Sequence, residues 1–438
     1  MKNYTTKQIR NVVLMGNTKA GKTTLSEALM YEGKVIDRRG TVEAKNTVCD
    51  NTEIEQLNQR SIYPTVFYTE YNDHKLNFID APGSDDFVGG LITAFEVADL
   101  GVMVVNAQQG VEVGTEIFSR YAEERKMPTI IAVNQIDHEK ANWDNTLESL
   151  RECYGKSKVC PIQFPVNPGG DFNAVIDVIM MKKLTWTAEG GAPKVEDIPA
   201  DLMDKAQEVQ AALIEAAAEN DEALMDKYFE TETLSPEEIL DGIRKGLTVR
   251  GIYPLVCICA SRDMGISRML EFVGEIAPSP LDMPLVKNTK GEEVALDATA
   301  PLSAFFFKTS MEPHIGEVSY FKVMRGTMKE NMDAVNADRS SKERIGQIFT
   351  CAGSNRVNIA EIPAGDLGCT VKLKDVKTGN TLCENGKEMS FDFIVYPNSK
   401  YSRSIKADNE SETEKMMAAI FRMHQEDPTW IVEQSKEL

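Results

Sequence analysis

The sequence predicts an α/β protein with a doubly wound parallel sheet in its first half and a β-barrel after it. Strand-like and helix-like runs alternate over the first 158 residues, which is typical of a doubly wound sheet. A glycine-rich run at 16–23 lies between the first strand and the first helix, where such sheets bind phosphates. Residues 290–390 read as short strands separated by Gly, Asn and Asp turns, as expected for a barrel.

The elements of the first domain follow from periodicity. Apolar, β-branched runs predict buried strands, and apolar residues at helical spacing predict helices. Strands are expected at 11–16, 63–71, 75–80, 101–106, 129–134 and 253–259. Helices are expected at 22–31, 88–98, 113–126, 142–154 and 265–276.

A long insertion interrupts the first domain. The nucleotide-binding domain is expected to comprise residues 1–158 and 249–281, with a mostly helical, acidic insertion at 159–248. The helical prediction depends on 206–218, which is rich in Ala, Glu, Gln and Leu with apolar residues at helical spacing.

Two further domains are expected. The β-barrel is predicted at 282–390 and a partial α+β domain at 391–438. The last domain should contain a strand at 402–407, a helix at 410–425 and a strand at 429–434. Two strands and one helix cannot cover both faces of a sheet, so one face would remain uncovered. We therefore expect the sequence to be truncated.

The run from Gly16 to Thr23 fits the phosphate-loop pattern G-x-x-x-x-G-K-[ST] at every fixed position. In such a P-loop, backbone N–H groups converge on the phosphates, and the helix dipole favours their negative charge. Lys22 is expected to reach the β- and γ-phosphates, and the Thr23 hydroxyl to bind Mg²⁺. The predicted nucleotide contacts of this loop are Gly16, Asn17, Thr18, Lys19, Ala20, Gly21, Lys22, Thr23 and Thr24.

Two motifs downstream predict that the base is guanine. Asp80 and Gly83 end a strand, where Asp80 could hold Mg²⁺ through water and the Gly83 N–H could bind the γ-phosphate. Asn134 and Asp137 end a later apolar strand, and the Asp137 carboxylate could accept hydrogen bonds from guanine N1–H and the 2-amino group. Adenine lacks this pair of donors, so ATP is the least favoured ligand and GTP or GDP with Mg²⁺ is expected.

A third loop on the base side is expected at Cys259, Ala260 and Ser261, directly after the last strand of the domain. In this order the motifs resemble those of the translational GTPases, specifically elongation factor G and its relatives, which include the tetracycline ribosomal-protection proteins. The runs 316–323 and 373–382 are similar to that family's second-domain β-barrel. The likeness covers nearly the whole chain and is greatest to the divergent second elongation factor G of some bacteria.

The resemblance implies a cytoplasmic protein that binds the ribosome, both its RNA and its proteins, and promotes translocation of tRNA and mRNA. We expect it to be monomeric. Two alternatives stay open: a ribosome-bound regulator or scaffold that does not hydrolyse its nucleotide, and a ribosomal-protection factor of the tetracycline-resistance type.

Three positions depart from the family pattern near the reaction centre. Ser84 stands where the family has the histidine that helps to order the attacking water, so this catalytic position is predicted to be inactive. Tyr63 stands where a threonine ligates magnesium in the first switch segment, and Gln135 replaces the lysine of N-K-x-D. We expect retained binding with slow or absent hydrolysis, although neutral drift of a redundant GTPase would leave the same changes.

Lys19 is a fourth departure. Relatives place an aspartate there, close to a monovalent cation that neutralises charge between the phosphates. The Lys19 ammonium could supply that charge covalently. An exposed lysine that points away from the phosphates is the alternative.

Composition bounds the remaining possibilities. No run approaches the roughly 18 apolar residues of a membrane span, and the N-terminus lacks the apolar stretch of a signal peptide. The eight cysteines include no C-x-x-C, so free core thiols are expected rather than a metal site or disulfides. Half of the net charge of −20 falls in residues 194–245, which predict either a solvated helix face or a docking surface for a basic protein.

Overall fold

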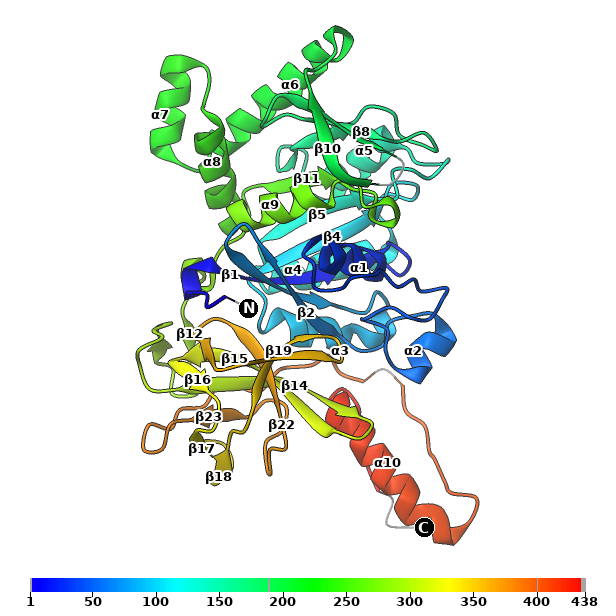
Figure 1. Cartoon of the computed structure of the whole chain (residues 1–438), viewed down its shortest axis with the longest axis vertical. Coiled ribbons are helices and arrows are strands. Elements are labelled where there is room, and N and C mark those ends of the chain that lie inside the picture. The colour runs from blue at the N-terminus through cyan, green and yellow to red at the C-terminus, as the bar shows by residue number, and fades with distance from the viewer. Residues whose placement is uncertain (1, 188–189, 400, 435–438) are drawn as a thin grey trace.

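The computed structural model describes residues 2–187, 190–399 and 401–434. An α/β domain lies in the middle of the molecule, with the insertion on one side and a β-rich domain on the other (Figure 1). This arrangement confirms the predicted fold class.

A seven-stranded sheet forms the centre of the first domain. Its strands are β1 (Ile9–Met15), β2 (Thr65–Tyr71), β3 (His74–Asp80), β4 (Leu100–Asn106), β5 (Thr129–Asn134), β6 (Val159–Pro161) and β11 (Tyr253–Cys257). They lie in the order β2-β3-β1-β4-β5-β11-β6, and every neighbouring pair is parallel except β2 and β3. The chain continues to opposite sides of β1, so the ligand crevice is expected at the carboxyl ends of β1 and its neighbours.

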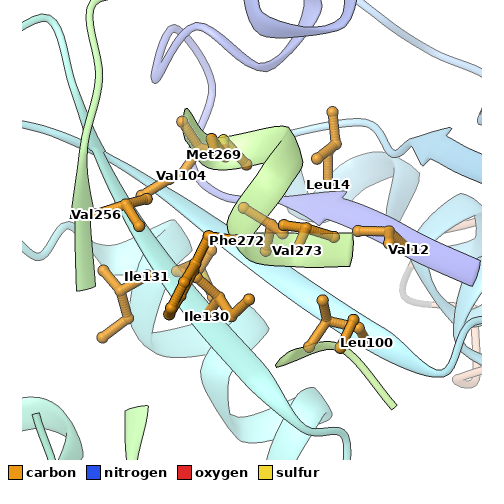
Figure 2. Close-up of a cluster of buried hydrophobic side chains, with 14 of the residues drawn as sticks. Val12, Leu14, Leu100, Val104, Ile130, Ile131, Val256, Met269, Phe272 and Val273 are labelled. Atoms are coloured by element: carbon orange, nitrogen blue, oxygen red, sulfur yellow. The ribbon is translucent and has the colours of Figure 1, made fainter. Parts of the chain in front are cut away.

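Helices cover both faces of this sheet because its strands are apolar on both sides. They are α1 (Lys22–Glu32), α3 (Val88–Phe95), α4 (Val113–Glu124), α5 (Trp143–Tyr154) and α9 (Ile266–Ile276), with the short α2 (Glu53–Asn58) between α1 and β2. In Figure 2, Phe272 and Val273 of α9 pack over Val12 of β1 and Ile130 of β5. All four side chains are fully buried. The predicted strands and helices of this domain are therefore present, with small shifts at their ends.

The insertion contains both strands and helices, so the prediction of a mostly helical segment is wrong for its first part. An antiparallel sheet of β7 (Gln163–Pro165), β8 (Ala174–Asp177), β9 (Lys182–Thr187) and β10 (Gly190–Glu196) precedes α6 (Ala200–Ala218), α7 (Glu222–Thr231) and α8 (Pro236–Thr248). Leu184 and Trp186 alternate with less buried residues, which is a strand pattern, but it spans only one short strand. In addition, β6 pairs with β11, so the main sheet extends past the expected boundary at residue 158.

The β-rich domain is an eight-stranded antiparallel sheet in the order β18-β17-β23-β14-β15-β22-β19-β20. Its strands are β14 (Ser303–Glu312), β15 (Gly316–Arg325), β17 (Asp333–Asn336), β18 (Ser341–Arg344), β19 (Ile348–Ala352), β20 (Asn355–Ile359), β22 (Leu367–Val371) and β23 (Thr381–Cys383). Two-stranded ladders join β12 (Val286–Lys287) to β13 (Glu293–Val294) and β16 (Thr327–Lys329) to β21 (Glu361–Pro363). Phe306 and Phe321 lie in its core, with ring centroids 5.5 Å apart.

Buried ion pairs join the first domain to the β-rich domain. The Lys75 ammonium lies 2.8 Å from both oxygens of Asp366, and Asn77 donates to the same carboxylate at 2.8 Å. Lys322 binds Asp99 at 3.0 Å. All of these side chains are buried. Since removing one partner of a buried pair costs about 3–5 kcal/mol, these contacts fix the two domains relative to each other.

The expectation that all cysteines are free is wrong for one pair. Cys351 of β19 and Cys369 of β22 form a disulfide, while the other six cysteines are free thiols. The two residues are 18 apart in sequence and become neighbours only because β19 and β22 pair. Sequence spacing alone does not contain that information.

The C-terminal segment has one helix, α10 (Thr413–Glu426), and the strands predicted at 402–407 and 429–434 are absent. A strand needs a neighbour for its backbone hydrogen bonds, and neither run pairs with any part of the chain that the structure describes. None of the described helices combines the length and apolarity that a membrane crossing requires. Short 3₁₀ helices lie at Thr6–Gln8, Asp85–Phe87, Ala260–Arg262, Pro280–Asp282 and Glu410–Glu412.

Candidate nucleotide site

The phosphate loop follows β1 and leads into α1, as predicted. Gly16 and Gly21 have φ of +143° and +93°, and a Cβ on Gly16 would lie 2.3 Å from the Val104 carbonyl oxygen. Only glycine fits this path. The Lys22 ammonium donates to the carbonyl oxygens of Gly16 at 2.9 Å and Asn17 at 3.1 Å, which holds it over the loop.

Gly83 lies directly against this lysine. A Cβ at Gly83 would be 2.3 Å from the Lys22 nitrogen, so a larger residue would displace the ammonium. The Thr18 hydroxyl donates to the Gly83 carbonyl oxygen at 2.8 Å. The sheet thus brings the loop after β3 to the phosphate loop, as the motif order predicts.

Four oxygen-bearing side chains meet beside Lys22. The Thr23 hydroxyl donates to Asp80 at 3.0 Å and lies 3.2 Å from the Ser61 hydroxyl. One oxygen of Asp80 and one of Asp50 are buried without a hydrogen-bond partner among the described residues. Buried carboxylate oxygens need a cation or a donor, and Mg²⁺ prefers oxygen ligands. The residues present therefore fit a magnesium ion.

Two members of this cluster, Ser61 and Asp50, were not predicted from the sequence. The expected alignment placed Tyr63 at the position of the magnesium-binding threonine, but the backbone N–H of Tyr63 donates to Glu55 and the hydroxyl beside Thr23 is that of Ser61. A small hydroxyl residue two positions before Tyr63 was the available signal. Asp50 had no signal, because the path of the loop that carries it cannot be derived from local pattern.

The base side of the site joins three loops. Asn134 donates to the Ala20 carbonyl oxygen at 3.0 Å and accepts from the Ala260 N–H at 3.0 Å. The Ser261 hydroxyl lies 3.5 Å from an Asp137 oxygen, and the buried Cys259 thiol lies 3.3 Å from the same hydroxyl. The predicted base-side residues are thus brought together.

A cavity of about 420 Å³ lies between these loops. Such a volume is within the range of small-molecule sites. Its lining comprises Gly21, Thr24, Asn134, Gln135, Asp137, His138, Glu139 and Ser261. Gln135 also donates to the Lys19 carbonyl oxygen at 3.0 Å, so the residue that replaces the family lysine braces the phosphate loop. His138 and Glu139 were not predicted; they directly follow Asp137.

Ser84 and Lys19 differ in their surroundings. The half-buried Ser84 hydroxyl donates to Asp86 at 3.2 Å, and Asp86 also pairs with Arg60 at 3.3 Å. The Lys19 side chain is exposed, and its ammonium makes no ion pair or hydrogen bond with any residue that the structure describes. Ser84 therefore lies in a network of carboxylate and guanidinium groups, whereas the Lys19 ammonium is free to turn toward a ligand.

Burial shifts the pKa values of the charged groups at this cluster. Burial, followed by the charge of Asp50, raises the pKa of Asp80 to about 7. Burial raises the pKa of Asp50 to about 6 and lowers that of Lys22 to about 8. In each case the low-dielectric surroundings disfavour the charged form.

These shifts predict a pH-dependent stabilisation by Mg²⁺. Unfolded carboxyls ionise near pH 4, so between about pH 4 and pH 7 the native state binds more protons and its free energy of unfolding falls as pH rises. Mg²⁺ should offset this loss by binding the ionised pair. We expect the gain in melting temperature on adding Mg²⁺ to be larger at about pH 8 than at about pH 5.5. An equal gain at both pH values, or an unchanged gain in the Asp80→Asn variant, would contradict this.

Comparison with known proteins gives two family matches and a structural match. The family of elongation factor Tu GTP-binding domains matches residues 7–279, and the family of elongation factor G domain 2 matches residues 301–385. A protein of Thermus thermophilus with a known crystal structure is similar to this chain, with a TM-score of 0.87 and 27% sequence identity. The match covers 98% of this chain and 63% of the other. This chain therefore spans less than two thirds of the length of that protein.

Proposed function

Since this chain belongs to the translational GTPases, with a GTP-binding domain followed by a second domain of the elongation factor G type, we propose that it acts on the ribosome as an elongation factor G-like protein. Family membership implies a guanine nucleotide. The observation that best supports this role is the pairing of an intact phosphate loop with Asp137 at the base cavity. Mg²⁺ would be held by the hydroxyl of Thr23 and, directly or through water, by Asp80, and it would neutralise phosphate charge.

We further propose that GTP hydrolysis is slow or absent. Ser84 has no imidazole, and its hydroxyl donates to Asp86. The nearby carboxylates would add negative charge beside the already anionic phosphates instead of stabilising the charge of the transition state. Arg60 pairs with Asp86 at 3.3 Å and lies over the ring of Phe87, 5.2 Å away, so Asp86 already partly neutralises its charge. Release of the factor would then depend on nucleotide exchange rather than cleavage.

Ribosome binding and translocation of tRNA and mRNA are proposed from the family. GTP would favour the ribosome-bound form by ordering the segments that contact its γ-phosphate. We expect a monomer that acts in the cytoplasm, where the ribosome is. A regulator that never cleaves its nucleotide would share all these contacts, so only a cleavage measurement separates the two roles.

Two measurements test this function. Calorimetry with GTP, GDP and ATP in the presence of Mg²⁺ should give binding of the guanine nucleotides and a large preference over ATP. Single-turnover cleavage with purified ribosomes should leave most GTP intact over many minutes. Equal affinity for ATP would overturn the assignment of the base, and rapid ribosome-dependent cleavage would overturn the claim of impaired hydrolysis.

Lys19 gives a prediction about cations. If its ammonium takes the place of a monovalent cation between the phosphates, any residual GTP cleavage should be insensitive to exchange of potassium for larger cations. The Lys19→Asp variant, which restores the family residue, should gain a potassium requirement. A strong potassium requirement in the unaltered protein would contradict this role.

A further inference from the structure

We propose that Arg39 is a positioning residue that latches the base-side loop and controls release of the guanine nucleotide. This inference rests on the proposed nucleotide site. Arg39 lies in the segment 33–52, which joins α1 to α2. One of its guanidinium nitrogens lies 2.6 Å from a carboxylate oxygen of Asp263, and the other donates to the Ala260 carbonyl oxygen at 2.7 Å. One side chain therefore holds both ends of the turn 260–263.

The latch is partly shielded from water. The side chains of Arg39 and Asp263 are only 17% and 19% exposed. A charge-assisted hydrogen bond in such surroundings is stronger than one at an open surface, and salt screens it less.

The turn that Arg39 holds also lines the base cavity. The Ala260 N–H donates to Asn134, and the Ser261 hydroxyl lies beside Asp137. A guanine bound at Asp137 would contact this turn through Ser261, so an outward movement of the turn would weaken the hold on the base. Arg39 opposes that movement.

The segment that carries Arg39 is itself fixed to α1. The fully buried Glu27 accepts hydrogen bonds from the Gly40 N–H at 2.7 Å and from the Val48 N–H at 2.6 Å. Gly40 directly follows Arg39, so the guanidinium is presented from a rigid backbone. Such an anchor allows the guanidinium to hold the turn in place.

The insertion contacts the same turn from the other side. Arg262 donates to the Phe172 carbonyl oxygen at 3.0 Å. A Cβ on Gly190, at the start of β10, would lie 2.5 Å from the Arg262 carbonyl oxygen. The turn is thus held between the segment 33–52 and the insertion, and a partner that shifts either one would alter how firmly the base is held.

The test measures the rate of nucleotide release. The chain is loaded with GDP that carries a fluorescent N-methylanthraniloyl group, and excess unlabelled GDP displaces it in a stopped-flow instrument. The Arg39→Ala variant should release the labelled GDP about tenfold faster, since a hydrogen-bonded charge pair is lost, while its association rate should change little. Arg39→Lys should restore part of the slow release, because lysine can still pair with Asp263 but cannot bind both groups as a fork.

Arg38 is a matched control. It is exposed and makes no ion pair or side-chain hydrogen bond with a described residue, so Arg38→Ala removes the same charge one position away and should leave release unchanged. Asp263→Ala should accelerate release, and the double variant Arg39→Ala/Asp263→Ala should be less than additive because both changes break one contact.

The outcomes are distinct. Failure of the unaltered chain to bind labelled GDP would overturn the nucleotide site and the latch together. Normal binding with equal release rates in Arg39→Ala and Arg38→Ala would overturn the latch alone. If Arg39→Ala also melts at a lower temperature, the milder Asp263→Asn variant decides: unchanged release there would likewise overturn the latch, and faster release would support it.

Discussion

Replacing Asp137 with asparagine is expected to weaken GDP binding about 100-fold and to allow binding of xanthosine diphosphate. The carboxylate can accept hydrogen bonds from guanine N1–H and the 2-amino group, and asparagine replaces one of these acceptors with a donor. Xanthine has a carbonyl in place of the amino group, so it offers that donor a partner. Calorimetry with both nucleotides in the presence of Mg²⁺ measures the change.

Glu139→Gln provides the control for this substitution. Glu139 lines the same cavity as Asp137. Its replacement with glutamine removes one negative charge from the cavity but leaves the Asp137 carboxylate unchanged. GDP affinity should change little in this variant. If both variants lose affinity equally, or if Asp137→Asn still prefers guanine, Asp137 does not read the base.

Replacing Ser84 with histidine is expected to raise ribosome-stimulated GTP cleavage by about 10²–10⁴-fold. The substitution restores an imidazole beside Gly83, whose backbone lies against Lys22 at the phosphate loop. Such a group can order the attacking water, and as imidazolium it can stabilise developing negative charge. Single-turnover cleavage with purified ribosomes measures the gain.

The Ser84→Ala variant separates the effect of adding an imidazole from the effect of removing the serine hydroxyl. It also frees Asp86 from its hydrogen bond but adds no ring, so cleavage should stay slow. If Ser84→His binds GTP normally and is as inactive as Ser84→Ala, the missing histidine is not what limits the reaction. The replacement of the switch threonine would then be the stronger cause.

Much of the first domain could be predicted from the sequence because its signals are local. Parallel strands buried on both faces are continuous apolar runs, as in Thr129–Asn134, and they are followed by helices of clear periodicity. The insertion sheet was missed because its strands are short and their alternation is brief. The Cys351–Cys369 bond depends on which strands pair, and local sequence does not determine that.

The same distinction applies to the site. Residues in motifs, such as Lys22 and Asn134, lie where the patterns place them, because the sheet edge brings the ends of its strands together. Ser61, Asp50 and Arg39 come from the segment between α1 and β2, which contains α2. Side-chain contacts of the buried Glu27 and Glu55 with backbone N–H groups set the path of this segment. No local rule gives that path, so these residues emerged only from the structure.

The buried ion pairs between the first two domains limit how this molecule can bend. A hinge motion between them would separate Lys75 from Asp366 and Lys322 from Asp99. Each buried charge would then lose its partner, which is energetically costly. Both ion pairs therefore oppose bending between the first domain and the β-rich domain. In calorimetry we expect the first domain and the β-rich domain to unfold in a single cooperative transition.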